Sequence, residues 1–102
     1  MPNPEEDVSL GNYRIFETKE FSRKLEALTP PDSKFIRKKL QDYVYPQLRE
    51  ETAFGKNIRK LRSYTPETWR YRISKFRIFY SVDDKDRIVL MLTIDQRKDV
   101  YK

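Results

Sequence analysis

The sequence contains no cysteine and no histidine, and only 2 of its 102 residues are glycine. Without cysteine the chain can form neither a disulfide nor a thiolate metal site, and without histidine it lacks the other common zinc ligand. Gly11 and Gly55 stand far apart, so there is no glycine-rich loop of the kind that binds nucleotide phosphates. We therefore expect no metal and no nucleotide or other cofactor.

Long apolar runs are missing as well. The chain has no stretch of about 18 apolar residues and no apolar signal-peptide core, so we expect neither a membrane span nor secretion. Together with the absence of cysteine, this favours a cytoplasmic protein. Residues 1–12, which are rich in proline and acidic side chains, are predicted to be a mobile lead-in. Residues 13–102 are predicted to form a single domain with one modest core.

Positive charge is concentrated in the second half of the chain. Residues 1–55 hold 9 Lys and Arg against 10 Asp and Glu, a net charge of −1, whereas residues 56–102 hold 13 against 6, a net charge of +7. Such a basic segment indicates a polyanionic partner. Charge alone leaves open whether that partner is RNA, DNA, an acidic protein segment or a membrane surface.

Apolar spacing predicts a short strand and then a helix near the start of the domain. The strand is expected at residues 13–17. The helix is expected to end at residues 29–31, where two consecutive prolines follow a threonine. Its apolar stripe is formed by side chains spaced i, i+4 and i+7, namely Phe21, Leu25 and Leu28.

A second helix is predicted to follow and to form a hairpin with the first. Asp32 or Ser33 is expected to cap its N-terminus. Pro46 is expected to end or kink it, because proline removes a helical hydrogen bond and clashes with the preceding turn. Residues 47–59 are then expected to be mainly a connecting loop. The apolar stripe of this second helix is predicted to comprise Ile36, Leu40 and either Tyr43 or Val44.

Three strands are predicted in the basic half of the chain. Residues 69–73 and 76–82 alternate between apolar and polar side chains, with the tight connection 74–75 between them. Residues 88–94, which follow the acidic turn 83–86, form a continuous apolar run. This run predicts a central strand that is buried on both faces.

The first of these strands carries a pair of arginines on one face. Alternation places Arg70 and Arg72 about 6.8 Å apart on the same side, while the odd-numbered side chains of residues 69–73 point into the core. Two guanidinium groups on one rigid face can hold a phosphodiester, because each presents a planar fork of donors that stays charged. The alternative is an ordinary solvated strand face.

An ordered series of motifs extends this pattern from residue 57 to residue 101. It runs Asn57-Ile58-Arg59-Lys60-Leu61-Arg62, Trp69-Arg70-Tyr71-Arg72-Ile73, Phe76-Arg77-Ile78-Phe79-Tyr80 and, after an acidic turn and an apolar strand, Gln96-Arg97-Lys98-Asp99-Val100-Tyr101. Preceded by a helical hairpin, the series resembles the RelE/ParE superfamily of toxins from type II toxin–antitoxin systems, with the RelE-like branch favoured. The resemblance implies an α+β fold in which an N-terminal strand and a two-helix hairpin pack on a twisted, mainly antiparallel sheet of about four strands.

The same resemblance implies a function. RelE-like toxins enter the ribosomal A site and cleave the mRNA there without a metal ion, by attack of an RNA 2′-hydroxyl on the scissile phosphate. The leading hypothesis is therefore a ribosome-dependent mRNA endoribonuclease that inhibits translation and is neutralised by a cognate antitoxin. The alternatives are a ParE-like inhibitor of DNA gyrase without catalysis and an inactive RNA-binding relative.

Roles for individual residues follow from the resemblance, position by position. Arg70 and Arg72 fall where RelE-like toxins have basic residues that flank the scissile phosphate. Arg77 falls at a phosphate-binding arginine, Arg97 at an arginine near the leaving group, and Tyr101 at a tyrosine that orients or stacks on the substrate. The residues expected to attract and bind RNA through their charge are Lys56, Arg59, Lys60 and Arg62.

A general base is not obvious for this reaction. A guanidinium group does not give up its proton in a protein, and Gln96 stands where many relatives have histidine. The remaining candidates are Asp95, Asp99 and Tyr101, none of which has an intrinsic pKa near 7. We expect positioning and charge stabilisation to supply much of the rate enhancement.

Overall fold

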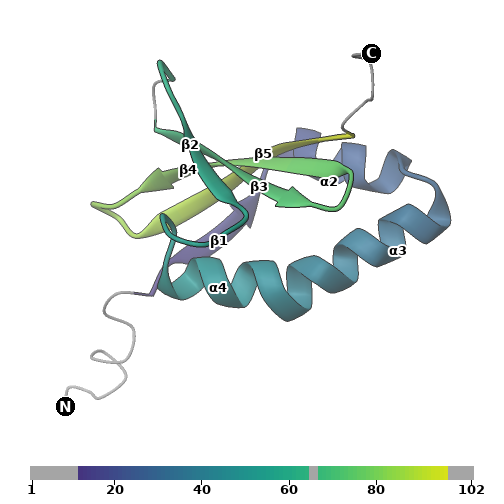
Figure 1. Cartoon of the computed structure of the whole chain (residues 1–102), viewed down its shortest axis with the longest axis horizontal. Coiled ribbons are helices and arrows are strands. Elements are labelled where there is room, and N and C mark those ends of the chain that lie inside the picture. The colour runs from purple at the N-terminus through teal and green to yellow at the C-terminus, as the bar shows by residue number, and fades with distance from the viewer. Residues whose placement is uncertain (1–11, 65–66, 97–102) are drawn as a thin grey trace.

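Five strands and a helical hairpin make up the fold in the computed structural model, which describes residues 12–64 and 67–96 (Figure 1). Helices α2 and α3 are followed by a π-helical turn, η1, and helix α4. The elements are β1 (Arg14–Glu17), α2 (Lys19–Ala27), α3 (Pro30–Lys39), η1 (Leu40–Val44), α4 (Tyr45–Glu50), β2 (Ile58–Leu61), β3 (Thr68–Ile73), β4 (Phe76–Asp83) and β5 (Ile88–Gln96). The predicted lead-in lies outside the described residues, apart from Asn12.

The strands form one sheet in the order β1-β5-β4-β3-β2. β1 runs parallel to β5, and the other neighbouring pairs are antiparallel. The α+β class and the mainly antiparallel sheet are confirmed, but the predicted number of strands is one too low. The missed strand is β2, in which Ile58 and Leu61 are half-buried while Arg59 and Lys60 between them are exposed. Because this pattern does not alternate, it lacks the usual sequence signal of a strand.

Strand β5 is central, as predicted, because it lies between β1 and β4. The prediction that both of its faces are buried is wrong. Val89, Met91 and Ile94 are buried, whereas the side chains between them are only half-buried. The helices cover one face of the sheet, so a continuous apolar run here reflects one core face and one partly open face. The register shift beside Phe79 and Tyr80 leaves Leu92 as an extra residue on β5.

The second helix begins earlier than its predicted caps. Thr29 is the cap of α3, and its hydroxyl accepts a hydrogen bond from the Asp32 backbone N–H over 3.4 Å. Pro30 opens the first turn of α3 and Pro31 follows it there, so the two prolines separate the helices and also start the second one. Proline is tolerated at this position because the first helical N–H groups have no intrahelical partner.

Pro46 does not end the helix, contrary to that part of the prediction. The chain passes through η1, where the Tyr45 N–H bonds to the Leu40 carbonyl five residues earlier, and Pro46 then lies in the first turn of α4. Figure 1 shows α3, η1 and α4 following one another as a single long rod. The wider π turn accommodates a residue that has no N–H to donate.

The core lies between this helical layer and one face of the sheet. Val44, and not Tyr43, belongs to the apolar stripe of the second helix, because Val44 is buried and Tyr43 is 59% exposed. The Tyr80 hydroxyl donates to the Thr52 carbonyl over 2.8 Å and so ties the loop after α4 to β4. None of the helices in the described part of the chain has the length and apolar character needed to cross a bilayer. The largest fully buried side chains are Tyr80, Phe21, Phe76, Leu25, Ile36, Leu48, Ile78, Met91, Val44 and Val89.

Candidate anion-binding face

The sheet face turned away from the helices carries four arginines from three neighbouring strands. Arg59 of β2 lies opposite Arg70 of β3, and Arg72 of β3 lies opposite Arg77 of β4. Partners that are directly opposite in a sheet point to the same side, as do alternate residues along one strand. These four residues, Arg59, Arg70, Arg72 and Arg77, are called the arginine face below.

Within this face, Arg72 and Arg77 form a like-charged pair that costs stability unless a counter-charge is present. Among residues 12–64 and 67–96, neither arginine takes part in an ion pair, and neither does Arg59. The Nε atoms of Arg72 and Arg77 are buried and have no hydrogen-bond partner among those same residues. The pair therefore offers two concentrated positive charges that an anion could neutralise.

A hollow of about 320 Å³ lies on the same face and is bordered by Arg72 of this pair. Lys56 and Asn57, from the loop before β2, border it together with residues of β2 and β3. The arrangement confirms that Arg70 and Arg72 share one face, and it brings two of the predicted RNA-binding residues, Lys56 and Arg59, next to them. The residues that line the hollow are Lys56, Asn57, Ile58, Arg59, Arg70 and Arg72.

Lys60 and Arg62, the other two predicted RNA-binding residues, lie elsewhere. Lys60 is paired in register with Trp69, which points to the opposite side of the sheet from Arg70. Its Nζ lies 2.7 Å from the Glu67 carboxylate and 5.9 Å from the centre of the Trp69 ring. Arg62 borders a separate hollow beside Lys60. The predicted RNA-binding set is thus divided between two sides of β2.

Arg97 and Tyr101 lie outside the described residues, as does Asp99, so their predicted roles remain predictions. The last described residue, Gln96, ends β5 opposite Phe76. Phe76 is the neighbour of Arg77 along β4, so the described chain stops close to the arginine face.

The general-base candidate Asp95 lies directly opposite Arg77, on β5. Its carboxylate is nevertheless engaged by a different cation, because the Nζ of Lys24 on α2 lies 3.5 Å from it. Sequence analysis did not single out Lys24, which belongs to a helix outside the basic half of the chain. Its spacing of four residues from Glu20 indicates an ordinary pair on a helix surface.

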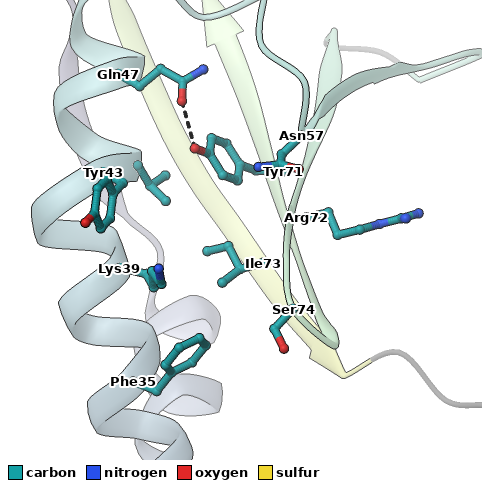
Figure 2. Close-up of a pocket in the computed structure, with 10 residues that line it drawn as sticks. Phe35, Lys39, Tyr43, Gln47, Asn57, Tyr71, Arg72, Ile73 and Ser74 are labelled. Carbon is teal, nitrogen blue, oxygen red and sulfur yellow. Dashed lines mark hydrogen bonds between the residues drawn. The ribbon is translucent and has the colours of Figure 1, made fainter.

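A groove of about 620 Å³ lies on the other side of β3, between that strand and the helical rod. Figure 2 shows Tyr71 and Ile73 pointing from β3 toward the helix, whereas Arg72 points away from it. The Tyr71 hydroxyl donates to the Gln47 side-chain carbonyl over 2.7 Å. Burial raises the pKa of Tyr71, so this phenol stays protonated and is not a base at neutral pH. The groove and the arginine face therefore lie on opposite sides of β3, and they meet at Arg72 and Asn57, which border both hollows.

Solved structures that share this fold include two toxin–antitoxin complexes and one isolated toxin. The toxin–antitoxin complex RelBE2 from Mycobacterium tuberculosis matches at 24% identity over 86% of this chain and 94% of that chain, with a TM-score of 0.66. The archaeal RelE–RelB complex from Pyrococcus horikoshii matches at 22% identity over 87% and 99%, with a TM-score of 0.58. The isolated E. coli RelE toxin matches at 20% identity over 87% and 88%, with a TM-score of 0.61.

A comparison with curated protein sequences found no match. A family model described as the ParE toxin of the type II toxin–antitoxin system parDE matches residues 15–101, which is most of the chain. At these low identities, the solved structures show that the fold is shared and no more, whereas the family model shows the family to which the chain belongs. This chain therefore belongs to the ParE toxin family of type II toxin–antitoxin systems, within the RelE/ParE superfamily.

Proposed function

We propose that the arginine face binds the phosphodiester backbone of mRNA, and that the protein is a RelE-like, ribosome-dependent mRNA endoribonuclease. The observation that supports this most is the directly opposed pair Arg72 and Arg77, with no ion pair to either among the described residues. Two like charges directly opposite each other lower the stability of the sheet. Their presence is explained if a bound phosphate neutralises them during function. A toxin of this kind acts in the cytoplasm, where the ribosomes are.

The reaction needs an attacking 2′-oxygen, a stabilised phosphoryl group and a departing 5′-oxygen. The 2′-hydroxyl gives up its proton to water and its oxygen bonds to phosphorus. The bond to the 5′-oxygen breaks, that oxygen takes up a proton from water, and the products are a 2′,3′-cyclic phosphate and a 5′-hydroxyl. Arg70, Arg72 and Arg77 are suited to stabilise the charge that develops on the phosphoryl oxygens, because fixed donors do not need to reorganise. Arg97 would neutralise the departing oxygen, and Tyr101 would stack on or orient the substrate.

A cognate antitoxin is proposed as the second partner. The family to which the chain belongs consists of toxins from type II toxin–antitoxin systems, and the RelBE2 and RelE–RelB structures are complexes of toxin and antitoxin. An acidic antitoxin segment that covered the arginine face would exclude RNA from it and would neutralise its charge.

The second candidate function is inhibition of DNA gyrase without catalysis. It is favoured by the family model itself, which describes ParE toxins. An inactive relative that only binds RNA is a weaker alternative.

Expression of the chain in cells that lack its antitoxin distinguishes these functions. We expect translation to stop and new mRNA 5′ ends to appear in phase with codons, and we expect these cuts to be lost in an Arg97→Ala variant. DNA breaks that depend on gyrase, together with intact mRNA, would instead establish the gyrase inhibitor and overturn the nuclease.

Neighbouring residues of β2 are expected to contribute very differently to RNA binding. Arg59→Ala should weaken binding of a fluorescein-labelled single-stranded RNA about tenfold, because one charge-assisted phosphate contact is lost. Lys60→Ala should change the affinity by less than about twofold, because Lys60 lies on the other side of the sheet and is paired with Glu67. Fluorescence anisotropy at one fixed salt concentration compares the two. Equal losses would mean that charge anywhere on β2, and not the arginine face, attracts the RNA.

A further inference from the structure

Asp95 is placed where it would be expected to neutralise Arg77. The two residues are directly opposite on β4 and β5, and such pairs have Cβ atoms about 4.5–5.5 Å apart, close enough for opposite charges to meet. The Asp95 carboxylate nevertheless pairs with Lys24 over 3.5 Å, and no ion pair to Arg77 occurs within residues 12–64 and 67–96. The carboxylate that lies opposite Arg77 is therefore paired with Lys24.

The position of Lys24 is fixed by the way α2 lies against β5. Strand β1 pairs with β5 only as far as Met91. At that point the Thr18 N–H donates to the Met91 carbonyl over 3.0 Å, and the Thr18 hydroxyl donates to the Leu92 carbonyl over 2.8 Å. Helix α2 starts there and continues along the second half of β5.

The buried side chains of α2 set its rotation about the helix axis. Phe21 is 0% exposed and Leu25 is 2% exposed, and both belong to the core. Lys24, one residue before Leu25, is 41% exposed and reaches the partly exposed Asp95 at the end of β5. The same ammonium group also lies 3.5 Å from Glu20, one turn earlier on α2. Lys24 thus contacts two carboxylates, of which Asp95 belongs to the sheet and Glu20 to its own helix.

We infer that Lys24 is a positioning residue, which holds the Asp95 carboxylate away from Arg77 and so keeps the Arg77 guanidinium available for a phosphate. The inference rests on the proposed binding of RNA by the arginine face. Without Lys24, the Asp95 side chain has Arg77 as its nearest cation across the sheet, and an ion pair there would neutralise one charge of the Arg72–Arg77 pair. Helix α2 would in this way control the strength of a site that it does not itself form.

A single variant and a double variant that should reverse its effect test this with a fluorescein-labelled single-stranded RNA and fluorescence anisotropy over a series of KCl concentrations. Lys24→Ala is expected to weaken binding about threefold to fivefold, in line with the strength of a partly exposed ion pair. For this variant the slope of log affinity against log salt concentration should be less steep by about 0.7, the change expected when one phosphate contact on a single strand is lost. Lys24→Ala/Asp95→Asn should restore both values to wild type, because the competing carboxylate is gone.

Two further variants are matched controls. Lys24→Arg should bind as wild type does, since it keeps the cation beside Asp95. Glu20→Gln should also bind as wild type does, because it removes the other carboxylate near Lys24 and leaves the Asp95 contact intact. Melting temperatures should agree closely across the set, because these side chains are partly exposed.

The outcomes separate this inference from the proposed function. If the double variant binds as weakly as Lys24→Ala, then Lys24 contacts the RNA itself and the positioning role is wrong. It is wrong as well if Lys24→Ala binds as tightly as wild type while Arg77→Gln binds more weakly. If Arg77→Gln has wild-type affinity, the arginine face does not bind RNA, and the proposed function fails together with the inference.

Discussion

Replacing Arg72 and Arg77 together by glutamine is expected to lower the affinity for single-stranded RNA by about a hundredfold or more. Each arginine should make a charge-assisted hydrogen bond to phosphate worth about 1.5–3 kcal/mol, and two such contacts account for this factor. Cleavage of mRNA on the ribosome should fall by at least as much, because a fixed donor at the phosphoryl group contributes about 10²–10³ in rate. Fluorescence anisotropy and single-turnover cleavage measure the two effects.

The stability of the same variant should change in the opposite direction. Arg72 and Arg77 face each other across neighbouring strands, and like charges in this arrangement destabilise a sheet. Glutamine keeps part of the aliphatic stem, so the free energy of unfolding is expected to stay constant or to rise slightly. A control variant, Arg37→Gln/Arg49→Gln, removes the same charge from the helical layer and should bind RNA nearly as well as wild type. If the control variant lost as much RNA affinity as the Arg72 and Arg77 variant, binding would depend on net charge alone and not on the arginine face.

The part of the arginine face on β3 and β4 could be predicted from the sequence because short-range rules are enough to build it, whereas Arg59 joins it only through the pairing of β2 with β3. Alternation along β3 puts Arg70 and Arg72 on one side, and the tight connection at Ser74 fixes the register that sets Arg77 opposite Arg72. Ser74 adopts a positive φ of 54°, so the turn forms there without the glycine that such hairpins prefer. Two adjoining strands and a two-residue turn therefore determine the central pair of the site.

Features that depend on contacts between distant segments could not be predicted in this way. The contact between Lys24 and Asp95 joins α2 to the last strand, and neither residue lies in a motif that indicates the other. Strand β2 is recognisable only through its pairing with β3, because its exposed middle residues give no alternation. Pro46 was not predictable for a different, local reason: it stays within the helical rod because η1 supplies a wider turn, which the preference of proline alone does not indicate.

Phe21→Ala is expected to cause the largest loss of stability among single changes in α2, about 3–5 kcal/mol in the free energy of unfolding. Phe21 is 0% exposed, so its removal leaves a cavity between α2 and the sheet that the neighbouring side chains can fill only in part. For a chain of this size the melting temperature should fall by roughly 12 °C or more. Chemical denaturation followed by circular dichroism measures both the midpoint and the slope.

The matched control is Phe54→Ala, which makes the same chemical change at a side chain that is 74% exposed. Its effect should stay within about 0.5 kcal/mol, because little apolar surface is removed from contact at that position. A loss at Phe54 comparable to that at Phe21 would contradict the assignment of the core to the space between helices and sheet. Because the packing of Phe21 also sets the rotation of α2, partial loss of this packing should loosen the Lys24 contact with Asp95. RNA affinity is then expected to fall in Phe21→Ala even at temperatures where the protein is still folded, and not to fall in Phe54→Ala.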